Sequence, residues 1–184
     1  MDNFKKSYII IPNIVFVLII IGCAIFFSLS PEKVTYNTLY SVDNSFSIDL
    51  PSNVSYQINN TDNNHFILDL YSPEDEMFLY ATKIPKQREL DLYQVVADDK
   101  VSYLKEKQNI REESTIIPYT IGDYKSYEYK FIHNDSSYQK DFYSNIVWIE
   151  TPKNLYILNF EVANDNKEKY LDIFNNIKNS FTEL

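Results

Sequence analysis

Two histidines stand beside acidic and amide side chains, and these residues are the ones in the sequence best suited to bind a metal. His65 follows "TDNN", which contains Asp62, and His133 precedes "ND", which contains Asp135. Imidazole and carboxylate groups are common zinc ligands, but a zinc site ordinarily needs three protein ligands. Nothing in the sequence identifies a third ligand, so we expect two solvated histidines at strand ends and no metal or other cofactor.

Three loops are rich in the oxygen ligands that calcium prefers, namely "NNTDNN", "PEDE" and "NDNKE". None of them matches the EF-hand pattern, so we expect solvated turns. The chain has only two glycines, Gly22 and Gly122. A phosphate-cradling loop needs several glycines, and a G-x-S-x-G elbow needs two close together. Because these templates are excluded and no other catalytic constellation is evident, we expect a protein that is not an enzyme.

Cys23 is the only cysteine, and it lies within the apolar stretch "LIIIGCAIFF". A single cysteine excludes an internal disulfide and a thiolate-rich metal site. "IIGC" loosely fits a bacterial lipobox, in which Cys23 would become the lipid-bearing first residue of the mature protein. The sequence stays apolar through "AIFFSLS", which favours an uncleaved helix. Lipidation of Cys23 and cleavage by an ordinary signal peptidase are the alternatives.

Residues 7–30 contain no charged residue and are long enough to cross a bilayer, since a helix rises about 1.5 Å per residue and the hydrocarbon core is about 30 Å thick. Lys5 and Lys6 precede this segment, and positive charge stays in the cytoplasm. The sequence therefore predicts a protein of the cell membrane with a single-pass anchor. We divide it into a cytoplasmic N-terminus (1–7), a transmembrane signal-anchor helix (8–30), a linker (31–44) and an extracytoplasmic domain (45–184).

The charge of the chain excludes one class of partner. The formal net charge is −9, and residues 1–30 contribute +1 through Asp2, Lys5 and Lys6, so residues 31–184 carry −10. Such an acidic domain repels phosphate backbones, and we therefore exclude nucleic acid as a partner.

Periodicity divides the domain into strands and two helices. Alternating apolar residues predict strands at 45–51, 53–59, 65–72 and 77–85, and again at 110–119, 123–133, 138–150 and 155–162. Helical spacing predicts helices over 89–108 and 167–184. Asp91 and Asp165 provide N-terminal cap signals, and the apolar face of the first helix is expected to hold Tyr93, Val96, Ala97, Val101 and Leu104.

The predicted order is ββββαββββα, which indicates an α+β protein. Connections of hairpin length favour an antiparallel sheet, and each amphipathic helix must cover one of its faces. Tyr127, Tyr129 and Phe131 share one face of a strand, and we expect them in the core. Tyr124, Tyr138 and Tyr143 are the residues expected at an exposed interaction surface.

Residues 44–184 resemble the PsbP-like (Mog/PsbP-fold) family. "NSFSIDLPSNVSY" is similar to the opening of these domains, and "NLYILNFEVANDNKEKYLDIFNNIKNSF" to their close. Val54 departs from the Trp that often follows the proline of the opening strand. The resemblance is to membrane-attached bacterial members of the DcrB type. It implies an α/β/α sandwich around a bent antiparallel sheet, together with docking onto larger complexes and no shared enzymatic activity.

The sequence therefore favours a non-enzymatic binding or assembly module that is anchored in the membrane. Its partner would be a protein or protein complex of the membrane or envelope. A structural role as an assembly or sporulation factor is compatible with the same features. The alternative is a small-molecule or metal-binding enzyme or sensor that uses His65, His133 and nearby carboxylates.

Overall fold

Antiparallel strands dominate the computed structural model, which describes residues 34–58, 66–86 and 91–184. Within these residues the main sheet has eight strands. Its hydrogen-bonded order is β3-β4-β5-β10-β9-β8-β6, and β7 also pairs with β8. The strands are β3 (Gln57–Ile58), β4 (Leu68–Ser72), β5 (Met77–Pro85), β6 (Gln108–Arg111), β7 (Ile117–Ile121), β8 (Tyr124–Asp135), β9 (Lys140–Glu150) and β10 (Asn154–Ala163).

A second, smaller sheet is built from both ends of the folded unit. It has the order β1-β2-β11, formed by β1 (Tyr36–Tyr40), β2 (Phe46–Pro51) and β11 (Thr182–Glu183). The expectation of one sheet is therefore wrong, because β2 pairs with β1 and β11 and not with the strand that follows it. Strand β1 also lies inside the segment 31–44 assigned to a linker, and the compact unit begins at Thr35.

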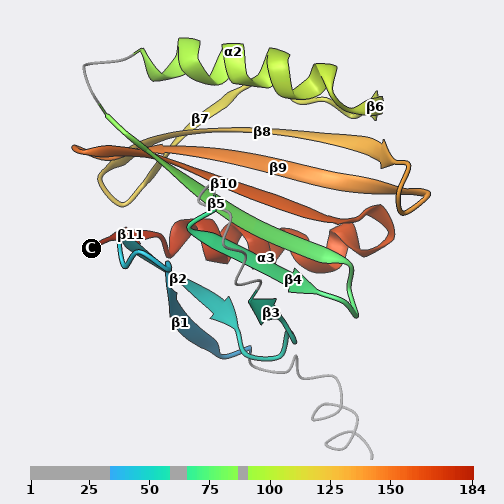
Figure 1. Cartoon of the computed structure of the whole chain (residues 1–184), viewed down its shortest axis with the longest axis horizontal. Coiled ribbons are helices and arrows are strands. Elements are labelled where there is room, and N and C mark those ends of the chain that lie inside the picture. Colours follow the sequence, from blue (N-terminus) through green and yellow to red (C-terminus); the bar gives the residue numbers. More distant parts are fainter. Residues whose placement is uncertain (1–33, 59–65, 87–90) are drawn as a thin grey trace, which may run out of the picture. The chain divides into compact units, whose positions relative to one another are not determined.

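Two α-helices cover opposite faces of the main sheet in the described part of the chain. They are α2 (Leu92–Lys105) and α3 (Lys167–Asn179), and a short 3-10 helix, η1 (Asn164–Asn166), precedes α3. Figure 1 shows α2 on one side of the sheet and α3 on the other. The predicted combination of a largely antiparallel sheet with two helices is thereby confirmed.

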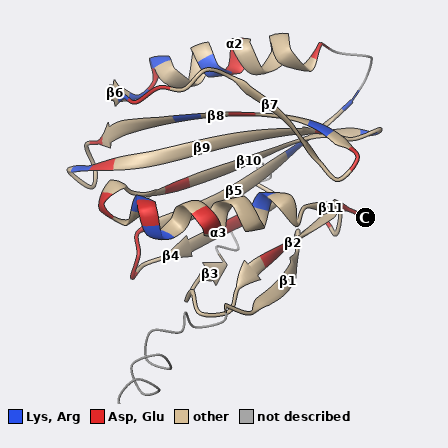
Figure 2. Ribbon diagram, turned by 180° about the vertical axis from the view of Figure 1, so that it is seen from behind, with Lys and Arg blue, Asp and Glu red and all other residues tan. Residues whose placement is uncertain are grey.

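Strand β10 shows why both faces need a cover. Tyr156, Leu158 and Phe160 point to the α3 side and join its core, whereas Leu155 and Ile157 point to the α2 side. A strand with apolar residues on both faces must be buried on both. Figure 2 shows Lys and Arg interspersed with Asp and Glu along α3, as expected for a helix whose other face meets solvent.

Two elements differ from their predicted extent. The strand predicted at 110–119 is divided into β6 and β7, because Glu112, directly after β6, has a φ of 50° and interrupts the extended backbone. The helix predicted to reach residue 184 ends at Asn179. Beyond it, Phe181 stacks on Phe46 with ring centroids 5.2 Å apart, and this contact directs the last residues into β11.

The turn and cap signals of the sequence have mixed outcomes. Gly122 forms the turn between β7 and β8 with φ +55°, as expected. Asp91 caps α2 by accepting a hydrogen bond from the Tyr93 N–H at 3.1 Å. Asp165 does not cap α3, because it lies within the 3-10 helix and Asn166 occupies the N-cap position.

Candidate functional site

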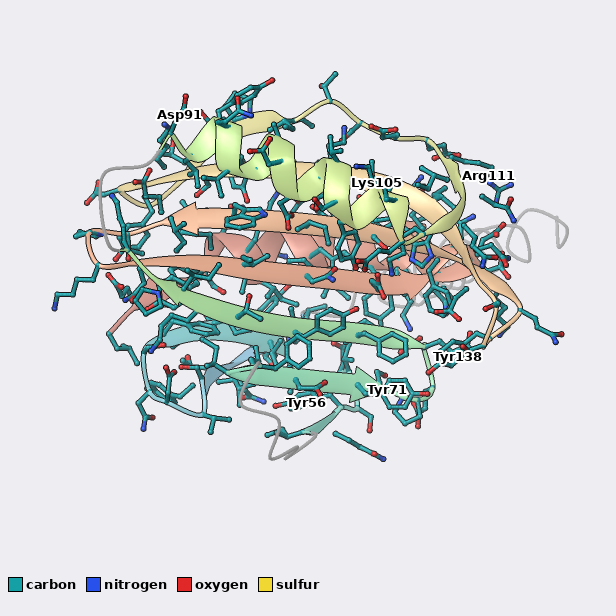
Figure 3. The ribbon with its side chains drawn as sticks, turned by 45° about the horizontal axis from the view of Figure 1, so that its top comes forward. Tyr56, Tyr71, Asp91, Lys105, Arg111 and Tyr138 are labelled. Carbon is teal, nitrogen blue, oxygen red and sulfur yellow. The ribbon has the colours of Figure 1, made fainter. Side chains whose placement is uncertain are left out.

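A cavity of about 220 Å³ lies between α2 and the main sheet. Its walls come from the residue two positions before β4, from β5, from α2 and from β9 and β10. The lining residues are Phe66, Tyr80, Thr82, Asp99, Tyr103, Ile146, Ile157 and Asn159. In Figure 3, α2 runs from Asp91 to Lys105 across this face of the sheet. An apolar lining with a few polar groups is typical of a site for a small organic ligand.

Helix α2 faces the sheet with residues spaced four, three and four apart, and the last two of them line the cavity. These residues are Leu92, Val96, Asp99 and Tyr103. The sequence prediction placed Tyr93 and Val101 on this face, and that is wrong, because about half of each side chain is exposed. The inner stripe was missed because Asp99, a charged residue, occupies one of its positions.

Glu161 on β10 is the centre of a hydrogen-bond network next to the cavity. Its carboxylate accepts hydrogen bonds from the hydroxyls of Tyr80 (2.9 Å), Tyr103 (3.2 Å) and Ser144 (3.1 Å) and from the ammonium of Lys107 (3.1 Å). Nε2 of His133 lies 3.4 Å from Oε1 of the same carboxylate. A buried carboxylate is costly unless it is paired and hydrogen-bonded, and these groups satisfy both needs.

These contacts control the ionisation of the groups around Glu161. Burial by itself raises the pKa of Glu161, but the contact with His133 and the positive charge of Lys107 outweigh it and lower the pKa to about 2. Burial, and then the charge on Glu161, raises the pKa of both Tyr80 and Tyr103. At neutral pH the carboxylate is therefore ionised, and the two hydroxyls remain protonated donors.

Asp99 has no cationic partner among the described residues. Its Oδ2 accepts hydrogen bonds from the Tyr129 hydroxyl at 2.8 Å and from Nε1 of Trp148 at 3.2 Å, and both donors are neutral. Two nearby lysines have other partners. Lys100 pairs with Glu113 at 2.8 Å, and Lys107 pairs with Glu161. The cavity therefore contains a negative charge that no described residue neutralises.

The amide of Asn159 has a defined orientation. Because the ionised Glu161 can only accept, the Tyr103 hydroxyl must donate to it, and the Tyr103 oxygen then accepts from Nδ2 of Asn159 at 2.9 Å. Oδ1 of Asn159 is left buried, and none of the described residues donates a hydrogen bond to it. The cavity thus holds a second acceptor that the described part of the chain does not satisfy.

Aromatic side chains extend along the same face beyond the cavity. We call Phe66, Tyr71, Phe78, Tyr80, Tyr138 and Phe142 the aromatic strip. Their ring centroids lie 4.8 Å apart for Tyr71–Phe78, 5.8 Å for Phe78–Tyr138, 5.4 Å for Tyr138–Phe142 and 5.3 Å for Phe66–Tyr80. Phe66 and Tyr138 are exposed. In Figure 3, Tyr71 and Tyr138 lie close together, and α2 does not cover them.

The predicted solvation of His133 is wrong, because only 1% of its surface is exposed. Its ring packs between Phe131 and Phe142, with centroids 5.6 and 6.3 Å away, and faces Glu161. Asp135 instead supports the β8–β9 turn by accepting a hydrogen bond from the Ser137 N–H at 2.8 Å.

The other two metal candidates, His65 and Asp62, lie outside the described residues. Within 34–58, 66–86 and 91–184, no group of three or more His, Cys, Asp or Glu side chains could hold a metal ion. In the loop "PEDE", Asp75 binds Lys169 and the Tyr170 hydroxyl, each at 2.6 Å, and Glu76 binds Lys140 at 2.7 Å.

The three tyrosines predicted at an exposed surface have different environments. Tyr138 is exposed and belongs to the aromatic strip. Tyr124 is partly buried on the α3 side against Phe181, at 5.9 Å. Tyr143 is buried in the core, so its predicted exposure is wrong. Tyr129 and Phe131, predicted in the core, are fully buried there.

The anchor helix predicted at 8–30 and its Cys23 lie outside the described residues. In the part of the chain that the structure describes, neither helix is long and apolar enough to cross a membrane.

Sequence reasoning missed the residues that surround the cavity. A signal was present in the strand "LYILNFEVA", where Asn159 and Glu161 follow Leu155 and Ile157 on the same face. Two polar residues that replace apolar ones on a buried face require buried partners. The sequence does not identify those partners, because they include residues of β5, β9 and α2, which are far from this strand along the chain.

Comparison with known proteins identifies the fold. No family model matches the chain, and no curated protein matches it. Solved structures do match. LpqN, a protein involved in cell envelope biogenesis of Mycobacterium tuberculosis, aligns with a TM-score of 0.57 and 14% identity over 82% of this chain and 91% of LpqN. Cyanobacterial PsbP from Synechocystis aligns with a TM-score of 0.56 and 8% identity over 84% of this chain and 96% of that protein.

The chain has a PsbP-like fold. The resemblance inferred from the opening and closing strands is thereby confirmed at the level of the fold.

Proposed function

We propose that this protein is a membrane-tethered, extracytoplasmic module that binds a protein of the cell envelope and catalyses no reaction of its own. The observation that carries this proposal is the aromatic strip, in which Phe66 and Tyr138 are exposed beside the partly buried Tyr71, Phe78 and Tyr80. Protein interfaces are enriched in aromatic residues, whereas the surfaces of monomeric proteins seldom expose several of them side by side.

The sequence supports the location. Residues 7–30 carry no charge and follow two lysines, which is the pattern of a signal anchor with its C-terminal domain outside the cytoplasm. LpqN, which shares the fold, is involved in cell envelope biogenesis. The shortage of glycine, which excludes the common nucleotide-binding and hydrolase templates, supports a role in binding over catalysis.

Site-specific photo-crosslinking in the native membrane tests the docking surface. A photoreactive residue replaces Tyr138 or Tyr71 on the aromatic strip, and a matched control replaces Asp172, which is exposed on α3. We expect one envelope protein to be cross-linked from both strip positions and not from position 172. Equal capture from position 172, or no capture from either strip position, would contradict the proposal.

The anchor requires a separate test. After alkaline extraction of membranes we expect the full-length chain to stay in the pellet, and mass spectrometry should recover peptides from residues 1–22. Cys23→Ala should leave both results unchanged, because an uncleaved helix does not need the thiol. A mature protein that begins with a diacylated Cys23 would instead establish the lipoprotein alternative, which also places the domain outside.

A further inference from the structure

The cavity between α2 and the sheet has a second use that does not require a protein interface. We propose that it binds the protonated amino group of a small organic amine, with the body of the ligand against Phe66 and Tyr80. The cavity volume of about 220 Å³ suits a small molecule or a single side chain as its occupant.

Charge favours a cation in this cavity. Asp99 carries the negative charge, and its only hydrogen-bond partners in the described chain are the neutral donors Tyr129 and Trp148, both on Oδ2. Lys100 and Lys107 are already paired with Glu113 and Glu161 and do not neutralise it. The net charge of −9 adds a long-range attraction for cations.

Hydrogen bonding favours a cation that carries N–H groups. Oδ1 of Asn159 is buried and receives no hydrogen bond from the described residues, and Asn159, which lines the cavity, is only 6% exposed. Oδ1 of Asp99 also has no donor from the described residues. An ammonium group has several N–H donors and can satisfy both acceptors, whereas a quaternary ammonium can satisfy neither.

Aromatic side chains complete the site. Phe66, Tyr80 and Tyr103 line the cavity, and the faces of such rings attract a cation that has left water. Tyr80 and Tyr103 donate their hydroxyl protons to Glu161, so their hydroxyls are not available as donors to a ligand. The charge of Asp99 and the two acceptor oxygens without a donor among the described residues therefore favour an amine over an anion, and the Thr82 hydroxyl, which also lines the cavity, can accept as well as donate.

Trp148 provides a direct readout, because it is the only tryptophan and its indole N–H donates to Asp99. The full-length chain, ¹⁵N-labelled in a nonionic detergent, is titrated with benzylamine while its single indole signal is followed. Benzyl alcohol, which is neutral, benzyltrimethylammonium, which lacks N–H groups, and inositol, a neutral polyol, are titrated in parallel. We expect the indole signal to shift saturably with benzylamine and to require at least tenfold more of each other compound.

Two neighbouring residues of α2 provide a matched pair of variants. Asp99→Asn removes the charge but keeps an oxygen that can accept from Tyr129 or Trp148, and it should weaken benzylamine binding about tenfold to a hundredfold. Asp98→Asn removes the same charge one residue away, on the exposed side of the helix, and should have little effect. Phe66→Ala, at an exposed position, should weaken binding severalfold without affecting the fold.

Several results would overturn the inference. They are no indole shift with benzylamine, equal binding of benzylamine and benzyl alcohol, or equal losses in Asp98→Asn and Asp99→Asn. If Asp99→Asn does not fold, an unchanged affinity in Phe66→Ala has the same meaning. A free amine and a lysine of a partner protein share this chemistry, so Nα-acetyl-lysine methylamide is titrated too. Tighter binding of this compound than of benzylamine would identify a lysine side chain as the natural occupant.

Discussion

The two faces of the main sheet are built differently. On the α3 side, residues from both sheets and from α3 form one apolar core that includes Phe46, Phe160, Phe174 and Phe181. On the α2 side, an apolar cluster includes Trp148. The same face also carries the polar residues Asn159, Glu161 and His133 and an open cavity. A face that is filled with apolar side chains stabilises the fold, whereas a face with unsatisfied polar groups and free volume is available for binding.

Each face also contains one buried carboxylate, and the two are satisfied in different ways. Glu128, on the α3 side, binds two lysines, Lys178 at 2.5 Å and Lys130 at 2.8 Å. Glu161, on the α2 side, receives three hydroxyls and one lysine. The first is mainly an ion pair between a helix and the sheet, and the second is a network that holds tyrosine side chains at the edge of the cavity.

The largest expected effect comes from the α3 side. Phe160→Ala should destabilise the protein by about 4 kcal/mol, because the ring is fully buried against Phe174, with centroids 4.8 Å apart. The matched change on the other face is Phe66→Ala, which should cost under about 1 kcal/mol because the side chain is exposed. Urea unfolding followed by Trp148 fluorescence measures both. Similar losses in the two variants would show that the faces do not divide these roles.

Acid should separate the wild type from Glu161→Gln. The folded protein lowers the pKa of Glu161 from 4.5 to about 2, so its contribution, roughly 3 kcal/mol, is complete above pH 4.5 and disappears as the pH falls toward 2. We expect the wild type to be more stable than the variant at pH 7 and the two stabilities to converge near pH 2. A constant difference across this range would mean that the network does not depend on the charge of Glu161.

Among the changes to the two buried carboxylate sites, replacing a lysine has the smallest expected effect. Lys178→Met should cost about 2 kcal/mol, less than for a fully broken buried pair, because Lys130 still neutralises Glu128. Lys107→Met should cost less again, since three hydroxyls remain on Glu161. The double variant Glu128→Gln/Lys178→Met should recover part of the loss. Chemical denaturation ranks the three variants, and the reverse order for the two lysines would contradict this account.

Periodicity in the sequence predicted the hairpin strands correctly, because apolar and polar side chains alternate along a strand that has one buried face. In β8, Tyr129 and Phe131 alternate with polar residues, and both were expected in the core. Tyr143 shows the limit of this reasoning. It lies in a strand that is buried on both faces, where alternation no longer separates inside from outside.

The sequence by itself determined the two helices and most of the strands before and between them, the acidic charge, the shortage of glycine and the resemblance to the PsbP-like fold. These properties depend on composition and on neighbours along the chain. Only the tertiary structure decided that β1, β2 and β11 form a separate sheet and that Glu161 meets Tyr80, Tyr103 and Lys107. It also decided that Asp99 faces the sheet without a cation among the described residues. The physical reason is that a buried carboxylate needs hydrogen-bond partners. The partners of these carboxylates come from strands and helices far apart in the sequence.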